Sequence, residues 1–373
     1  SIQRAYTMAK KINFGPGPAK LPEAVMEKAH REFIIYENTG ISILEMSHRS
    51  ADFTNILRQT EQLLRDQMNI PAEYEVFFMQ GGGTGQFAAV PLNLARGKST
   101  AEYAVTGAWS SKAAAEAANY LTVNKPFPVS KPFCTISDTA TWERSPDVAY
   151  LYYCANETVH GIEFPNAPET HDGVPLVADI SSNFLSRPFD FKNHGVVFGG
   201  TQKNLGAAGS TVVIARKDLL GHEPKTCPSV LSYKTNAENK SVYNTPPVYS
   251  IYLTKLVLEW IRDLGGVDKI AELNNEKSSR VYDVIDKSNS FYSCAVTPSC
   301  RSRMNVPFRI GGPAGDEALE AAFLKGATER GMLGLKGHRS VGGIRASLYN
   351  AVTVEETAAL VEWMKEFQEK NQA

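Results

Sequence analysis

The chain has 373 residues, of which 43% are hydrophobic and 21% charged, and its formal net charge is -1 at pH 7. This length allows a large core and about two domains, and the composition is that of a globular protein. The charges are interspersed without a basic tract, which argues against a surface that binds nucleic acid or a membrane. The sequence contains no run of about 18 apolar residues, so no membrane span is predicted.

The cysteines indicate a reducing environment. They are five, scattered and without a C-x-x-C pair, at positions 134, 154, 227, 294 and 300. Neither a disulfide framework nor a zinc or other metal site is predicted, and a cytoplasmic location is favoured, with an organelle left open.

The first eleven residues carry Arg4, Lys10 and Lys11 and no acid. They are interpreted as an expression scar before Met8 or a disordered start, with the remnant of an organellar transit peptide as the less favoured alternative.

The next elements predict an α/β fold. A turn-rich segment at residues 12–19 precedes helices predicted over residues 22–36 and 52–68. Short apolar runs then alternate with helices. The runs predicted as strands cover residues 76–79, 103–105, 149–154, 176–178, 196–198 and 211–215. Such continuous apolar strands predict a mostly parallel, seven-stranded type of sheet covered by helices on both faces.

A long helix is predicted over residues 248–264 and ends at Gly265-Gly266. The remaining chain alternates between helix and strand, with helices over residues 269–287, 317–330 and 354–370 and strands over residues 305–310 and 343–348. The predicted organisation is therefore an N-terminal segment of residues 1–20 near the small domain, a large domain of residues 21–264 and a small α/β domain of residues 265–373.

Lys203 stands between two apolar strands among Gly199, Gly200, Gly206 and Gly209. Such small neighbours let other backbone or a ligand approach the lysine closely. A partly desolvated lysine favours its amine form, which can form a Schiff base. A solvated loop lysine is the alternative, and the lysine alone favours it.

Three further residues follow predicted strands. Asp179 either pairs with a pyridinium nitrogen or caps a helix. Trp109 either stacks on a cofactor or belongs to the core, and Thr158 either donates to a ring oxygen or caps a turn. Because ligands bind beyond the carboxyl ends of parallel strands, all three are expected at one site.

The glycine cluster at residues 81–85 lies between a strand and a helix that is predicted to begin at Gln86, and free N–H groups there can hold a phosphate. The segment from Gly83 to Ala88 also matches the G-x-G-x-x-A dinucleotide fingerprint, so an NAD-dependent oxidoreductase is a rival class. The expected acid, Glu102, stands before the next strand instead of at its end. A plain tight turn is the third alternative.

Two His-Arg pairs and one further arginine form a third group of candidates. Arginine forks match carboxylates and phosphates, so these residues are candidates for a substrate with an anion at each end. They are His48, Arg49, His338, Arg339 and Arg345. Each of them alone is also compatible with a structural role.

Six stretches together resemble the phosphoserine aminotransferase family. They are residues 13–19, 46–50, 80–91, 156–161, 179–184 and 336–350. The likeness spans nearly the whole chain from Lys11. It implies a pyridoxal 5'-phosphate enzyme of fold type I that acts as a homodimer with shared active sites. The implied reaction, in L-serine biosynthesis, converts 3-phosphohydroxypyruvate and glutamate to O-phospho-L-serine and 2-oxoglutarate.

The resemblance also implies roles for individual residues. Lys203 is similar to the Schiff-base lysine, Asp179 to the partner of the pyridine nitrogen, Trp109 to the stacking ring and Thr158 to the donor to the ring hydroxyl oxygen. The cofactor phosphate is expected at Gly83, Thr84 and Gln202, and at Asn244 and Thr245 of the partner subunit. The substrate α-carboxylate is expected at Arg345, and its distal anion at His338 and Arg339 and at His48 and Arg49 of the partner subunit.

Two alternatives besides the oxidoreductase stay open. One is another fold type I aminotransferase acting on a different dianionic amino acid. The other is a binding protein for a phosphorylated metabolite, against which Lys203 and its small neighbours argue.

Overall fold

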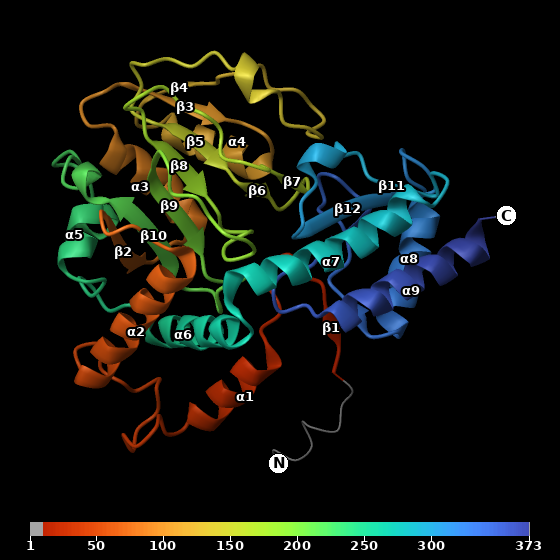
Figure 1. Ribbon diagram of the computed structural model, residues 1–373, viewed down its shortest axis with the longest axis horizontal. Helices are drawn as coiled ribbons and strands as arrows, with labels where there is room; N and C mark the ends of the chain where they lie inside the picture. The colour runs from red at the N-terminus through yellow and green to blue at the C-terminus, as the bar shows by residue number, and fades with distance from the viewer. Residues whose placement is uncertain (1–9, 373) are drawn as a thin grey trace.

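A seven-stranded sheet forms the centre of the larger part of the molecule (Figure 1). The computed structural model describes residues 10–372, so the expectations for residues 1–9 lie outside the described residues. In spatial order the strands are β2 (Tyr74–Met79), β10 (Thr211–Arg216), β9 (His194–Gly200), β8 (Leu176–Asp179), β5 (Leu151–Cys154), β3 (Thr100–Ala104) and β4 (Thr122–Asn124). Only β10 runs antiparallel to its neighbours in this sheet, which confirms the predicted mostly parallel sheet.

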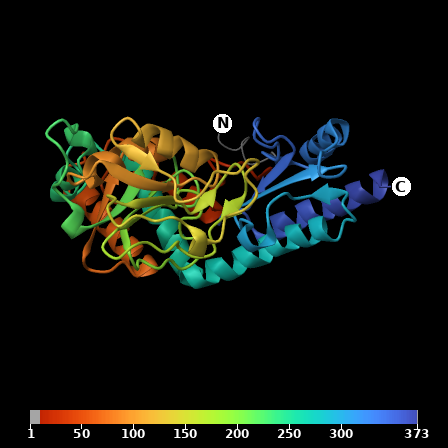
Figure 2. The same cartoon turned by 90° about the horizontal axis from the view of Figure 1, so that it is seen from above.

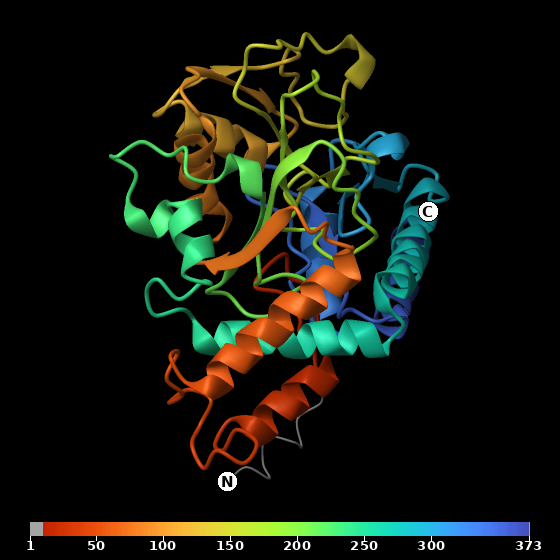
Figure 3. The same ribbon diagram turned by 60° about the vertical axis from the view of Figure 1, so that its left-hand side comes forward.

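Helices cover both faces of the sheet because adjacent strand residues point to opposite sides. One face, with Phe77 and Tyr152, packs against α3 (Gly82–Leu94), α4 (Ala108–Ala117) and α5 (Tyr233–Glu238). The other face, with Phe78 and Tyr153, packs against α2 (Ala51–Met68) and α6 (Val248–Asp263). The helix α1 (Glu23–Glu32) lies outside α6, away from the sheet (Figure 3).

The smaller part of the molecule is joined to the larger by the long helix α7 (Gly266–Asp286), as Figure 2 shows. Its three-stranded antiparallel sheet consists of β11 (Tyr292–Ser293), β12 (Asn305–Ile310) and β14 (Ile344–Ser347). The helices α8 (Glu317–Glu329) and α9 (Val354–Asn371) complete it. Near the N-terminus, β1 (Ile12–Asn13) pairs in parallel with β13 (Met332–Leu333) of this part. A short pair, β6 (Asn156–Glu157) and β7 (Ile162–Glu163), follows β5.

Two predicted helix boundaries are wrong by four residues, and the helix predicted from Lys269 begins three residues earlier, at Gly266. The first helix ends at Glu32 instead of Tyr36, because Tyr36 turns into the core and packs edge-on against Tyr252, with the two ring centres 5.8 Å apart. The helix expected from Gln86 begins at Gly82 instead, so the glycine cluster forms its first turn. Gly81 caps this turn with a φ of 96°, a conformation that favours glycine.

Buried polar side chains connect the two parts. Asn204, the neighbour of Lys203, accepts the Asn350 N–H at 2.9 Å, and the Asn350 side chain in turn accepts from Asn274 of α7 at 2.9 Å. Lys277, also on α7, donates to the carbonyl groups of residues 348, 349 and 352 at 3.0, 2.9 and 2.8 Å. Since this segment follows β14, α7 holds the end of that strand in place.

We expect Lys277→Met to lower the free energy of unfolding by about 1–3 kcal/mol, because the substitution leaves buried carbonyl groups without a donor. Urea unfolding of the variant should be compared with that of Lys365→Met, which removes an exposed lysine from the adjacent α9. Equal unfolding midpoints for the two variants would contradict the structural role of Lys277.

Candidate active site

A cavity of about 490 Å³ lies where the carboxyl ends of the parallel strands meet the smaller part of the molecule. The chain reaches it directly after five of these strands. The lining residues that bear on chemistry are Gly81 to Thr84 after β2, Trp109 after β3, Thr158 after β5, Asp179 at the end of β8, Gln202 and Lys203 after β9, and His338 and Arg345 from the smaller part. The predicted residues that follow the strands at this edge of the sheet therefore line one cavity.

Lys203 is buried at the wall of this cavity. Its Nζ donates to Thr158 Oγ1 at 2.8 Å and lies 5.8 Å from the centre of the Trp109 ring. A Cβ at Gly17 would lie 3.4 Å from Lys203 Cε. The loop that contains Pro16 and Gly17, here called the entry loop, therefore packs closely against the lysine side chain. Burial lowers the pKa of Lys203 to about 8, while the Asp179 carboxylate opposes this change. The solvated-loop alternative for Lys203 is therefore wrong.

Asp179 is a buried carboxylate at the end of β8. Its Oδ1 accepts the Ser181 N–H at 2.9 Å, and the Tyr152 hydroxyl donates to Oδ2 at 3.4 Å. Burial raises the pKa of Asp179, and hydrogen bonds from Ser181 oppose this change. A cationic ring nitrogen beside the carboxylate would offset the cost of its burial, so the residue fits a pyridinium ligand.

The first turn of α3 forms an anion cradle. The N–H groups of Gly82, Gly83 and Thr84 have no carbonyl acceptor one turn earlier in the helix, and together with the helix dipole they favour a negative charge. Beside Gly82 the space is open, since a Cβ there would have no other atom within 4 Å. This opening allows a phosphate to approach the backbone.

Two buried donors of the cavity lack a partner among the described residues, namely Trp109 Nε1 and Arg345 Nε. Arg345 projects from β14 and also donates to the Thr158 carbonyl at 3.3 Å. Because a buried donor without an acceptor is costly, both atoms indicate a ligand with acceptor oxygens.

His338 is half-buried at the same end of the cavity, and its Nδ1 lies 2.7 Å from Ser340 Oγ. Burial, together with the neighbouring cations of Arg345, Arg339 and Lys112, lowers the pKa of His338. A bound dianion would restore its positive charge, since an opposite charge favours the protonated imidazole.

Five predicted site residues do not line the cavity of this single chain: His48, Arg49, Asn244, Thr245 and Arg339. All of them except the half-buried His48 are exposed. Asn244 donates to Gln80 Oε1 at 3.0 Å. The roles assigned to these residues therefore depend on a second subunit or, for Arg339, on a bound substrate.

The cavity also contains residues that the sequence analysis did not assign. They include Pro16 and Gly17 of the entry loop, Lys112, Asn156, Ser181 and Ser182. The entry loop reaches Lys203 because β1 pairs with β13 on the other side of the cavity, a contact between segments that are 320 residues apart. Lys112 follows Trp109 by three residues on the same helix, so the sequence spacing alone could have indicated that the two side chains are neighbours.

Glu102 does not serve the dinucleotide alternative. Its carboxylate is buried and accepts the Ser145 N–H at 2.8 Å, and it does not line the cavity. The glycine run that matched the fingerprint forms the anion cradle instead.

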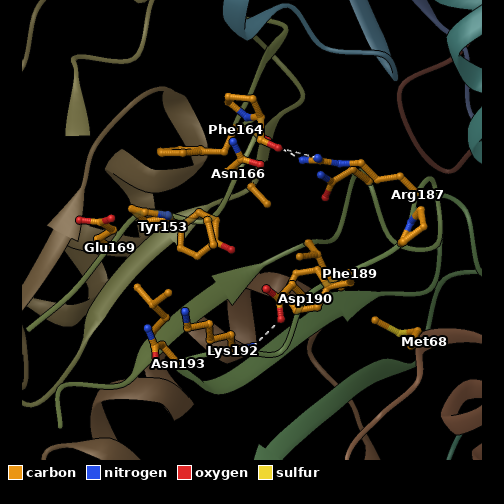
Figure 4. A pocket seen from close by; sticks show the side chains of 18 of the residues that line it. Met68, Tyr153, Phe164, Asn166, Glu169, Arg187, Phe189, Asp190, Lys192 and Asn193 are labelled. Carbon is orange, nitrogen blue, oxygen red and sulfur yellow. Dashed lines mark hydrogen bonds between the residues drawn. The ribbon is translucent and has the colours of Figure 1, made fainter. Parts of the chain in front are cut away.

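A second cavity of about 330 Å³ lies on the opposite face of the sheet (Figure 4). Tyr153 and Ala155 line it, whereas their neighbours Cys154 and Asn156 line the first cavity, as strand alternation requires. Its arginine, Arg187, is already bonded to backbone carbonyls, one of them at 2.7 Å. None of the predicted site residues lines this second cavity.

The chain is similar to known proteins over nearly its whole length. A family model described as Aminotransferase class-V matches residues 12–360. A probable phosphoserine aminotransferase of Caenorhabditis elegans is 61% identical, with 96% of this chain and 97% of that protein covered. The phosphoserine aminotransferase of Drosophila melanogaster is 52% identical, with 96% and 99% covered.

Solved structures agree with these relatives. A phosphoserine aminotransferase from Bacillus circulans subsp. alkalophilus has a TM-score of 0.93 at 42% identity, with 97% of this chain and 99% of that chain covered. A PLP-bound phosphoserine aminotransferase from Trichomonas vaginalis has a TM-score of 0.90 at 39% identity, with 95% and 100% covered.

The lowered pKa of Lys203 predicts an unusual pH dependence of its reactivity. Reductive methylation of the cofactor-free protein, followed peptide by peptide by mass spectrometry, should show a half-maximal rate at Lys203 near pH 8, because only the neutral amine attacks formaldehyde. In Asp179→Asn the midpoint should move to lower pH, since the carboxylate favours the protonated amine. A midpoint near 10.5, the ordinary value for a lysine, would contradict the burial of this amine.

Proposed function

Since this chain belongs to the class-V aminotransferase family, we propose that it acts as a phosphoserine aminotransferase. The proposed reaction is a reversible exchange in which 3-phosphohydroxypyruvate and glutamate give O-phospho-L-serine and 2-oxoglutarate. The observation that carries the proposal is one cavity that combines a buried lysine amine, a buried carboxylate, a helix N-terminus and a buried arginine.

The cofactor is pyridoxal 5'-phosphate, and the residues of the cavity fit it. Asp179 would hold the ring nitrogen, Trp109 would stack on the ring and Thr158 would donate to the ring hydroxyl. The cofactor phosphate would be bound by Gly83, Thr84 and Gln202, together with Asn244 and Thr245 of the partner subunit. When bound, the cofactor supplies an electron sink for the charge that develops at the substrate α-carbon.

Lys203 is proposed as the general base and acid. A pKa of about 8 leaves about a tenth of the amine neutral at pH 7. This amine would take the proton from the α-carbon of the amino acid that is consumed and, in the opposite half-reaction, deliver a proton to the α-carbon of the amino acid that forms. The hydrogen bond to Thr158 Oγ1 holds the amine at the cavity wall. Asp179 would be ionised beside a bound cationic ring and would favour the protonated form of the ring nitrogen.

Arg345 is proposed to bind the α-carboxylate, because its free Nε lies buried in the cavity and a guanidinium can hold a carboxylate by two bonds. The distal anion is assigned to His338 and Arg339, with His48 and Arg49 of the partner subunit. Phosphoserine and glutamate each carry an α-carboxylate and a distal anion, so the same cations can serve both half-reactions.

We also propose a homodimer whose active sites are shared. Support comes from apolar side chains that remain exposed in the segment after α1, with Ile34 70%, Leu44 55% and Ile35 50% exposed. Such a patch is characteristic of a protein interface. It lies next in sequence to His48 and Arg49, which do not reach the cavity of their own chain. A two-fold partner that covers the patch would bring the same residues to its neighbour's site.

The proposed location is the cytoplasm. Support is limited to the five cysteines, all of which are free thiols in the structure. Free thiols without disulfides fit a reducing compartment.

Substrate selectivity tests the proposed function. Wild-type enzyme should strongly prefer phosphoserine to alanine in kcat/KM. Arg345→Ala should impair phosphoserine, glutamate and alanine alike, whereas Arg339→Ala should impair phosphoserine most, each by about tenfold to a hundredfold for a lost charge-assisted hydrogen bond. Arg280→Ala, on the exposed side of α7, is the control and should change none of these constants. Equal use of alanine and phosphoserine by the wild type would refute the assignment and favour another aminotransferase.

Subunit mixing tests the shared site. Lys203→Ala and Arg49→Ala homodimers should each be inactive, but their mixed dimer contains one site with both residues intact, so subunit exchange should restore activity. Lys203→Ala mixed with Arg345→Ala is the control, because both residues belong to the cavity of one chain and no mixed site is intact. If verified mixed dimers of the first pair stay inactive, Arg49 does not act across the interface.

A further inference from the structure

Glu157 is a fully buried carboxylate that the sequence analysis did not single out. It stands in β6, directly before Thr158, whose hydroxyl accepts the hydrogen bond from Lys203. Burial raises the pKa of Glu157, and hydrogen bonds from Ser110 and Trp109 oppose this change. A buried carboxylate is costly unless donors satisfy it, so its partners indicate what it does.

Three donors from the start of α4 converge on this carboxylate. Trp109 N–H donates to Oε2 at 2.9 Å, while the N–H and the hydroxyl of Ser110 donate to Oε1 at 2.9 and 2.6 Å. These N–H groups belong to the first helical turn, which has no acceptor of its own. The residue at the N-cap position is Gly107, which has no side chain to accept them. Glu157 therefore caps α4 from a different segment of the chain.

Gly107 leaves room for this cap. A Cβ at this position would lie 2.4 Å from Glu157 Cδ. The φ of Gly107 is -175°, an extended conformation open to any residue, so the requirement for glycine is purely steric. The Glu157 carboxylate occupies the space that a capping side chain at position 107 would fill.

We propose that Glu157 is a positioning residue that fixes the Trp109 ring relative to Lys203, and thereby sets the orientation of the cofactor ring in the cavity. It joins two walls of the site, since α4 carries Trp109 and the segment after β6 carries Thr158. The role deepens the proposed function and rests on it. It differs from a simple helix cap because loss of the carboxylate should alter the cofactor environment and the chemical step, and not stability alone.

The test uses the holoenzyme and the variant Glu157→Gln, which keeps the side-chain volume. A glutamine turns one acceptor oxygen into a donor NH2 group that faces the Trp109 or Ser110 N–H. We expect kcat to fall at least about tenfold, since small displacements of a catalytic constellation cost up to about a hundredfold. KM for glutamate should change much less than kcat. The circular dichroism of the bound cofactor in its visible band should change as the stacking geometry changes.

Glu102→Gln is the matched control. Glu102 is also buried, accepts a backbone N–H at 2.8 Å and has a pKa that burial raises, but it lies outside the cavity lining. This variant should be less stable than the wild type while it keeps kcat and the cofactor dichroism.

Gly107→Ala provides an independent variant, because its Cβ displaces the carboxylate without altering it. It should reproduce the kcat loss and the dichroism change of Glu157→Gln, and the double variant should be little worse than either single one. Glu157→Asp, which retains the charge, should recover part of the dichroism.

Unchanged dichroism and kcat in Glu157→Gln would overturn the proposal, as would the same changes in Glu102→Gln. If Glu157→Gln fails to fold, kcat and the cofactor dichroism of Gly107→Ala and Glu157→Asp decide the question instead. Failure of the proposed function can be distinguished, because it would appear as a wild-type enzyme that does not transaminate phosphoserine, whereas the dichroism requires only bound cofactor.

Discussion

The burial of the Lys203 amine is the constraint on which the site depends. An ammonium group in this position loses its hydration, so the neutral amine is favoured and the pKa falls to about 8. The desolvation is produced by elements far apart in sequence. The entry loop at Gly17 covers the lysine side chain, and Thr158 accepts its hydrogen bond. Asn204, the residue after Lys203, accepts the N–H of Asn350 and so ties this part of the chain to the smaller part of the molecule.

Two buried carboxylates balance this basic centre in different ways. Among the described residues, the Asp179 carboxylate accepts hydrogen bonds from Ser181 and, at 3.4 Å, from the Tyr152 hydroxyl, so part of its interaction capacity is left for a cationic ligand. Glu157 is satisfied by three protein donors and therefore acts on the geometry of its neighbours instead of on a ligand. The number of donors that the fold supplies to each carboxylate thus separates a ligand-binding group from a positioning group.

The cations are arranged around the cavity in two classes. Arg345 is buried and lines the cavity of the single chain together with the half-buried His338, whereas Arg339, His48 and Arg49 do not line it. Such an arrangement fits a site in which the α-carboxylate is bound by one subunit and the distal anion is enclosed when a second subunit and the substrate are present. The exposed apolar residues after α1 are consistent with the same requirement, because water contact with them is unfavourable.

Local patterns predict the framework of the fold. The strand at residues 305–310 was predicted with its observed bounds, the other predicted strands were located with their ends displaced by a few residues, and β4 was not predicted. The motifs after the strands of the large sheet were expected at one edge, because parallel strands end together, and they line one cavity. Features that depend on contacts between distant segments follow only from the three-dimensional structure. The first helix stops at Glu32 because Tyr36 packs on Tyr252. The helix of the glycine cluster starts at Gly82, although the low helix propensity of glycine favoured a later start. The role of Glu157 was equally hidden, since a lone glutamate after a strand carries no sign of the helix start that it caps 47 residues away. Local pattern fixes the type and order of the elements, whereas the energy of a buried charge is fixed by the partners that the fold brings to it.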